Sequence, residues 1–255
     1  LKEFFKEYER LTGYTANICI ENMNCKNLSE GMQWNCRMAK LLDNHKATPP
    51  SLIILLGQEA WASFLSQTSD MARKTPSMGA MIGTNALEAP KEKDVNLRTF
   101  MPNSREYPSF TNFNIVGGIF YKYDVERNIE LIRKFYPNTK NIAFLSDFTL
   151  GGLTLQALVR KTMEEKYKDL NLTLLDGRRS TVFEVCTQIQ KLPPHTALLL
   201  GTWRIDSSDN YVLANTTGPI SKAAPNVPAF SLSSIGMGYW AIGGYTPEYS
   251  LAGKE

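Results

Sequence analysis

The sequence lacks the side-chain patterns of most metal sites. Its four cysteines, Cys19, Cys25, Cys36 and Cys186, show no CxxC spacing, and the chain has only two histidines. A structural zinc site is therefore not expected. Buried free thiols are the preferred interpretation of the cysteines, and a disulfide between Cys19 and Cys25 across a turn is the alternative. Cysteine usage leaves the redox compartment open.

The sequence also lacks the motifs of known catalytic centres. It contains no G-x-S-x-G nucleophile elbow, no G-x-x-x-x-G-K-[ST] phosphate loop and no G-x-G-x-x-G after a strand. His45 and His195 stand at helix ends or beside prolines, which favours surface or packing roles over that of a base. We therefore expect no enzymatic activity from this domain, with no catalytic residue, no metal ligand and no cofactor.

Long apolar runs and a strong charge of one sign are missing as well. No stretch reaches the roughly twenty apolar residues of a membrane span, and no signal-peptide pattern is visible. The formal net charge of +3 over 255 residues gives no reason to expect nucleic acid as a partner. The pair Arg178-Arg179 fits a solvated turn better than a phosphate-binding patch. Because the chain starts in a helical pattern without an initiator Met, we expect an excised domain of a longer protein.

What the sequence does contain is an alternation of apolar runs and helical patterns. The segment Asn141 to Tyr167 shows it most clearly, because a short apolar run is followed by a polar turn and then by apolar residues at helical spacing. Such a unit is half of the repeating element of a parallel sheet. Further strands are expected over 17–22, 51–57, 77–83, 170–175, 196–201, 227–232 and 239–245. The alternation predicts an α/β fold with helices covering parallel sheets.

Two regions of the chain share one plan. SLIILLG-QEAW, from Ser51, and TALLLG-TWRI, from Thr196, each combine a buried strand that ends in Gly with a polar residue and a nearby Trp. The similarity suggests two comparable lobes. We expect the chain to cross from the first lobe to the second near Val116 to Asp124.

Polar and aromatic side chains follow the expected strands, where parallel α/β sheets bind their ligands. A small-molecule site needs a few polar groups for orientation and aromatic walls for contact area. For any single residue, core packing or helix capping is an equally good interpretation. Taken as a set, the residues favour a ligand site, and the candidates are Gln58, Glu59, Trp61, Thr84, Asp147, Phe148, Thr149, Thr202, Trp203, Ser231 and Ser234.

Several segments resemble the substrate-binding proteins of ABC transporters that have the type I periplasmic fold. GGIFYKYDVERNIELIRKFYPNTKNIAFLSD, from Gly117, is similar to the family's entry into its second lobe, and SLIILLGQEAWASFL to its strand-turn-helix. PSMGAMIG stands where its next inner strand is found, and VPAFSL and IGGYTPEYSLAG resemble its return to the first lobe. The resemblance implies two Rossmann-like lobes joined by a hinge, with a ligand cleft between them. The lobes would be residues 1–117 plus 236–255, and residues 118–235.

The chain also departs from this family. The strand that normally precedes the first helix is absent, and Gln58-Glu59 replaces the usual Thr and small residue. Similar domains serve as extracytoplasmic sensors of hybrid two-component histidine kinases, and the excised appearance fits a sensor slightly better than a solute-binding protein of an ABC importer. The resemblance implies a periplasmic location and a small polar or amphipathic ligand, amino-acid-like or sugar-like. The membrane would be reached only through a tether outside this chain, and a homodimer is one alternative for the oligomeric state.

Overall fold

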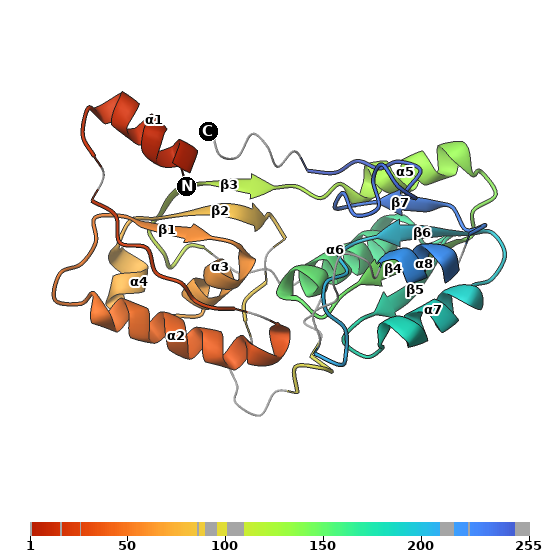
Figure 1. Ribbon diagram of the computed structural model, residues 1–255, viewed down its shortest axis with the longest axis horizontal. Helices are drawn as coiled ribbons and strands as arrows, with labels where there is room; N and C mark the ends of the chain where they lie inside the picture. Colours follow the sequence, from red (N-terminus) through yellow and green to blue (C-terminus); the bar gives the residue numbers. More distant parts are fainter. Residues whose placement is uncertain are drawn as a thin grey trace.

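The computed structural model contains two α/β lobes, each built on its own parallel sheet (Figure 1). It describes residues 2–15, 17–25, 27–85, 87–89, 96–100, 110–209, 217–223 and 225–247. One sheet has three strands and the other has four, and every strand pair in both sheets is parallel. The predicted fold class, two α/β lobes with parallel sheets, is confirmed.

The first lobe holds the sheet β1-β2-β3, with β2 in the centre. Its strands are β1 (Ile53–Leu56), β2 (Ser77–Gly83) and β3 (Ile115–Tyr121). The helices are α1 (Lys2–Thr12), the 3-10 turn η1 (Leu28–Glu30), α2 (Gly31–Asn44), α3 (Gln58–Leu65) and α4 (Asp70–Lys74). Residues of α2, α3 and α4 pack against one face of this sheet in a single apolar cluster.

The second lobe holds the sheet β5-β4-β6-β7. Its strands are β4 (Asn141–Ser146), β5 (Asn171–Asp176), β6 (Thr196–Leu200) and β7 (Ala229–Ser231). The helices are α5 (Val125–Phe135), α6 (Leu150–Lys166), α7 (Val182–Gln190) and α8 (Thr217–Ala223).

Helices cover both faces of the second sheet. Alternate residues of β4 and β6 point to opposite sides, as the period of a strand requires. Phe144 and Leu199 pack with α5 and α6 on one side, whereas Leu145 and Leu200 pack with α7 and α8 on the other. All four are fully buried, so β4 and β6 form the centre of a three-layer sandwich.

The helix that follows the central strand begins where the sequence suggests. Thr149 is the N-cap of α6, and its hydroxyl accepts a hydrogen bond from the Gly152 N–H at 2.9 Å. The cap satisfies one of the N–H groups that the first turn of a helix leaves without a partner. The Gly151-Gly152 pair therefore lies inside the first turn of the helix, which continues to Lys166.

Several local predictions differ from the structure. Residues 17–22 were expected to form a strand, but they have no regular secondary structure and no ladder partner, and residues 239–245 form only isolated bridges. Alternating or apolar sequence is not enough for a strand, because its backbone groups also need a neighbouring strand to pair with. The free thiols of Cys19 and Cys36 are exposed rather than buried, and those of Cys25 and Cys186 are half-buried.

The predicted limits of the lobes, residues 1–117 plus 236–255 and residues 118–235, stay a prediction, and two observations bear on them. The expected boundary after residue 117 falls inside β3, which pairs with β2 as far as Tyr121. Residues 236–247 were assigned to the first lobe but contact the second. There the N–H of Ser231 donates to the carbonyl of Gly243, and Asn128 of α5 bonds the backbone of Tyr245 in both directions. Residues 248–255 lie outside the described part of the chain.

Within the described residues, no helix combines the length and the apolar composition that crossing a membrane requires.

Candidate ligand site at the junction of the lobes

Asp147 is the centre of a hydrogen-bonded turn at the carboxyl end of β4. Its Oδ1 accepts from the Thr149 hydroxyl at 2.6 Å and from the Thr202 hydroxyl at 2.9 Å. Its Oδ2 accepts from the backbone N–H of Arg204 at 2.8 Å. These bonds tie the turn after β4 to the turn after β6. The structure thus brings together three of the predicted site residues, Asp147, Thr149 and Thr202.

The carboxyl group of Asp147 is enclosed rather than open to a cleft. The residue is 1% exposed, and a Cβ on Gly152 would collide with its carboxylate. Burial raises the pKa of Asp147, and the hydrogen bonds that it accepts act in the opposite direction. With four donors already in place, counting the Thr149 N–H, the carboxylate is suited to shaping the two turns. Its role as a direct ligand contact stays a prediction.

Gln58 connects the two lobes directly. It opens α3, and its Nε2 donates to the Thr154 hydroxyl of α6 at 2.8 Å. Asn85, just after β2, donates from Nδ2 to the backbone carbonyl of the same Thr154 at 2.9 Å. One residue of the second lobe therefore receives a hydrogen bond from each of two strand ends of the first lobe.

Glu59 lies next to Gln58 and carries a carboxyl group into the same junction. It is half-buried, and burial raises its pKa above the ordinary value. The positive charge of Arg204 opposes that shift, and the negative charge of Asp147 adds to it. Both of these residues belong to the second lobe, so charges across the junction act on the pKa of Glu59. A half-buried acid with a raised pKa, set among charges, is typical of functional sites.

The three predicted aromatic residues lie in three different apolar clusters. Trp61 is fully buried in the core of the first lobe, where its ring stacks edge-to-face on Phe110 and Phe120 at 5.5 Å. Trp203 is 4% exposed and packs in the core of the second lobe. Phe148 is fully buried between the lobes. In this conformation all three rings are covered by protein, and their contact with a ligand stays a prediction.

The cluster that holds Phe148 joins the lobes, and we call it the interlobe cluster. The first lobe supplies residues of η1, α2 and α3 and of the segment after β2, and the second supplies residues around the start of α6 and after β6. Its buried members are Leu28, Trp34, Ala62, Leu87, Ala89, Phe148, Leu150, Leu153, Ala157 and Ile205. The backbone N–H of Leu28 also donates to the carbonyl of Phe148 at 3.3 Å. Apolar packing therefore closes the junction beside Gln58 and Glu59.

The remaining predicted residues lie apart from this group. Thr84 is exposed and lines a pocket of about 290 Å³ with Asn85 and with side chains of α5 and α6, among them Lys161 and Lys166. Gln58, Glu59 and Asp147 do not line that pocket.

The two predicted serines lie beyond β6, in the second lobe. Ser231, at the end of β7, is fully buried, and the backbone at Gly244 approaches it so closely that a Cβ there would collide with the Ser231 carbonyl. Ser234 is exposed and has a positive φ of 79°. Neither serine has a contact with the Asp147 turn among the hydrogen bonds of the described residues.

Sequence reasoning missed Arg178. The pair Arg178-Arg179 was expected to form a solvated turn, and Arg179 is exposed, but Arg178 is only 2% exposed. Its guanidinium donates three hydrogen bonds to the Asp176 carboxylate, Nε–Oδ1 at 3.0 Å, Nε–Oδ2 at 3.2 Å and Nη2–Oδ2 at 2.6 Å. It also donates to Gln156 of α6 and to the backbone carbonyl of Phe100. An acidic residue two positions before an arginine is common in turns, so the presence of Asp176 before Arg178 did not indicate that Arg178 is buried.

No family model and no curated protein matches the sequence. The structure is similar to a conserved domain protein from Vibrio cholerae, with 16% identity, a TM-score of 0.56, and coverage of 99% of this chain and 75% of that one.

Two further structures are similar over most of the chain. One is an ABC domain from Streptococcus pneumonia in complex with L-Trp, with 14% identity, a TM-score of 0.45, and coverage of 82% of this chain and 68% of that one. The other is the ligand-free, open form of a substrate-binding protein with adhesive properties from Clostridium difficile. Its values are 16% identity, a TM-score of 0.49, and coverage of 91% and 68%. At these identities, similarity bears on the fold alone, and the match to the Vibrio protein supports it over the whole chain.

Proposed function

We propose that this chain is an extracytoplasmic domain that binds a small polar or amphipathic molecule between its lobes. The observation that carries the proposal is Glu59, a half-buried carboxyl group at the first turn of α3 that faces charges of the second lobe. A ligand amine placed there would supply the positive partner that its burial calls for. Gln58 would orient the polar part of the same ligand. An amino-acid-like compound combines these features, and a sugar-like compound is the alternative.

Ligand entry requires the lobes to separate, because the interlobe cluster and the bond from Gln58 to Thr154 close the junction. A ligand that bound the closed form better than the open form would shift the population toward closure. The contacts that hold the closed form together are apolar packing and a few hydrogen bonds, which suits a change between open and closed forms. The connection from β3 to α5, residues 122–124, is where we expect the hinge.

We further propose that closure is the signal of a two-component histidine kinase, with this chain as its periplasmic sensor. The alternative is a solute-binding protein of an ABC importer, in which the closed form would be presented to a permease. The residues that follow Glu255 in the natural protein separate the two roles. A membrane helix followed by a kinase domain supports the sensor, and a chain that ends without them supports the importer.

A thermal-shift screen tests the binding proposal. Amino acids, sugars and nucleosides are added to the purified domain, and one of these classes is expected to raise its Tm. Glu59→Gln should abolish the shift, whereas the control Glu9→Gln, an exposed position of α1, should keep it. If no class stabilises the folded domain, or if both variants respond as the wild type does, the proposal fails.

One observation favours a second candidate, a protein-interaction module with no ligand between its lobes. Thr149 is a helix cap, and the hydrogen-bonding capacity of Asp147 is largely taken up within the turn. These are structural roles for two predicted ligand contacts. An enzyme on the same fold would need Asp147 or Glu59 as an acid or base, and the hydrogen-bond partners of Asp147 in the described structure are hydroxyls and backbone amides. We rank the enzyme below both.

A further inference from the structure

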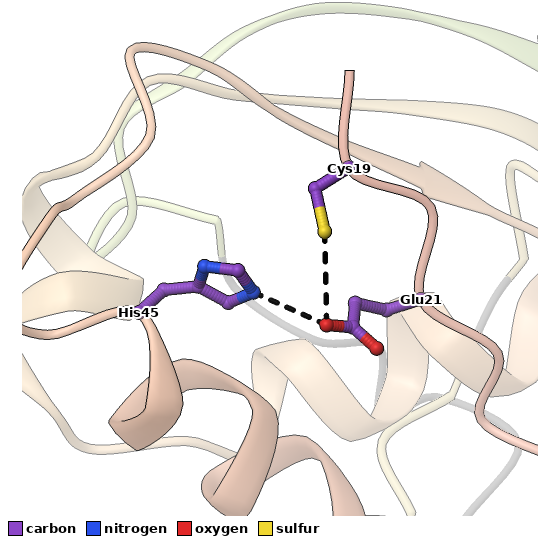
Figure 2. A group of neighbouring side chains, drawn as sticks. All are labelled: Cys19, Glu21 and His45. Atoms are coloured by element: carbon purple, nitrogen blue, oxygen red, sulfur yellow. Dashed lines mark hydrogen bonds and ion pairs between the residues drawn. The ribbon is translucent and has the colours of Figure 1, made fainter. Parts of the chain in front are cut away.

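Three side chains with metal-ligating atoms, from two separate segments of the chain, meet at the end of α2. Cys19 and Glu21 come from the segment 17–25, which has no regular secondary structure, and His45 is the first residue after the helix (Figure 2). The Nε2 of His45 lies 3.2 Å from Oε1 of Glu21, and the Sγ of Cys19 lies 3.8 Å from the same oxygen. All three atoms lie within 4.8 Å of one another.

We propose that Cys19, Glu21 and His45 form a binding site for Zn²⁺. Zinc is bound at about 2.3 Å by sulfur and at about 2.0–2.2 Å by nitrogen and oxygen, in tetrahedral geometry. Those lengths and a tetrahedral angle place a nitrogen and an oxygen ligand about 3.4 Å apart, and a sulfur and an oxygen ligand about 3.6 Å apart. The distances in the structure, 3.2 Å and 3.8 Å, differ from these by about 0.2 Å each. Two of the three ligand pairs therefore have the spacing of one coordination sphere, and the third pair, Sγ of Cys19 and Nε2 of His45, lies within 4.8 Å.

The donor set determines which metal suits the site. Thiolate and imidazole select zinc and other borderline or soft ions, whereas Mg²⁺ and Ca²⁺ require mainly oxygen ligands. Binding removes the proton of the Cys19 thiol and uses His45 as a neutral imidazole, so it releases protons to solvent. Because Cys19 is exposed and Glu21 is 44% exposed, water can take the fourth position.

Two features of the surroundings hold the ligands in place. His45 is the C-cap of α2, where the partial negative charge of the helix end favours a cation. Arg37, two turns earlier on the same helix, donates from Nη1 to the carbonyls of Met23 and Asn24 at 3.0 Å and 2.9 Å. The segment that carries Cys19 and Glu21 is thus fastened to the helix that carries His45, which lowers the cost of assembling the site.

Binding would tie residues 17–25 to α2 and stabilise the first lobe. The three ligands do not belong to the interlobe cluster and do not include Gln58 or Glu59, but Met23 and Cys25 of the same segment pack against that cluster. Its ligands are separated by up to 26 positions in the sequence, which is why motif spacing gave no indication of a zinc site. The ion would act as a clamp on a segment that has no strand partner.

Calorimetric titration of the reduced, metal-free chain with Zn²⁺ tests the site. We expect one ion per chain and a loss of zinc affinity of at least about tenfold in each of Cys19→Ser, Glu21→Gln and His45→Gln. Even substitutions of residues that only hydrogen-bond to the ligands of a metal site lower its affinity by that much. Cys36→Ser is the matched control, because it also removes an exposed free thiol from the first lobe. It should bind as the wild type does.

An absorption spectrum with Co²⁺ in place of zinc tests whether the Cys19 thiolate is a ligand. The wild type and Cys36→Ser should show thiolate-to-cobalt charge transfer, and Cys19→Ser should not. Melting curves without metal should be alike in all variants, since the altered side chains are exposed or half-exposed. Equal zinc affinity in Cys19→Ser and Cys36→Ser, or a charge-transfer band that survives Cys19→Ser, would overturn the proposal.

Discussion

The sheets of the two lobes are built alike but are covered differently. β6 lies inside the second sheet with helices on both faces, and all five of its residues are buried. β1 lies at the edge of the first sheet with helices on one face, and only Leu55 of its four residues is buried. Stability within a fold follows buried apolar contacts. We therefore expect the second lobe to be the more rigid partner in any opening of the junction.

The ends of the strands repeat this difference. In the second lobe the turns after β4 and β5 are closed by buried carboxylates, Asp147 and Asp176, whose oxygens accept several hydrogen bonds. In the first lobe the turn after β1 presents Gln58 and Glu59, which are half-buried and face the junction. The second lobe thus supplies a fixed wall, and the first supplies the side chains that can adjust to a ligand.

The largest expected effect concerns the buried ion pair of Arg178 and Asp176 in the second lobe. Arg178→Ala leaves the carboxylate of Asp176 buried without its cation, and breaking such a pair costs about 3–5 kcal/mol of unfolding free energy. Arg179→Ala, one residue away at an exposed position, should change stability by less than about 0.5 kcal/mol. Urea unfolding of both variants measures the difference. Equal small losses would show that the buried pair adds nothing.

The comparison of the strands themselves is tested by their last residues. Leu200, before Gly201, is 0% exposed, and Leu56, before Gly57, is 44% exposed. Leu200→Ala should cost about 2–5 kcal/mol through lost burial and a cavity. Leu56→Ala should cost less than about 1 kcal/mol, because most of the side chain already meets solvent. Similar losses measured by urea unfolding would mean that the open face of the first sheet is covered in solution.

A smaller effect is expected at the bond across the junction. Gln58→Ala removes the hydrogen bond to Thr154, and a neutral bond of this kind contributes about 0.5–1.5 kcal/mol. Gln33→Ala, which removes an exposed amide on α2, is the control. Unfolding free energies of the two variants provide the measurement. A loss at Gln58 no greater than that at Gln33 would indicate that the lobes are not held together by this bond.

The smallest effect concerns pH. Burial raises the pKa of Glu59 above 4.5, so the Glu59 carboxyl group binds its proton more tightly in the folded chain than in the unfolded chain. The stability linked to this proton is present below pH 4.5 and is lost as the pH rises through the raised pKa of the folded state. Glu59→Gln should therefore melt close to the wild type in acid and above it at neutral pH. A Tm difference that does not change with pH would contradict the shift.

The sequence predicted the class of the fold because apolar runs and helical patterns are local. The predicted strands 77–83 and 196–201 and the helix after Asp147 all appear, since each is specified by neighbours along the chain. The sequence could not show that SLIILLG forms an edge strand and TALLLG an inner strand, because the position of a strand in its sheet depends on which strands pair. The strand predicted over 17–22 was wrong for the same reason.

Among the site residues, proximity at strand ends was predictable and burial was not. Asp147, Thr149 and Thr202 do meet, as carboxyl ends of neighbouring parallel strands must. Whether a side chain faces a ligand or the core depends on packing from distant segments. Phe148 is covered by η1 and α2, and Asp147 by the turn after β6. The buried role of Arg178 and the meeting of Cys19, Glu21 and His45 have the same long-range origin.

A crystal structure with the compound that raises the Tm most tests the central claim most directly. We predict the compound between α3 and the turn after β4, with the Glu59 carboxyl group bonded to its polar or charged group. The lobes should remain closed around it. A compound bound on the outer surface or in the pocket beside Thr84, with Glu59 untouched, would contradict the account.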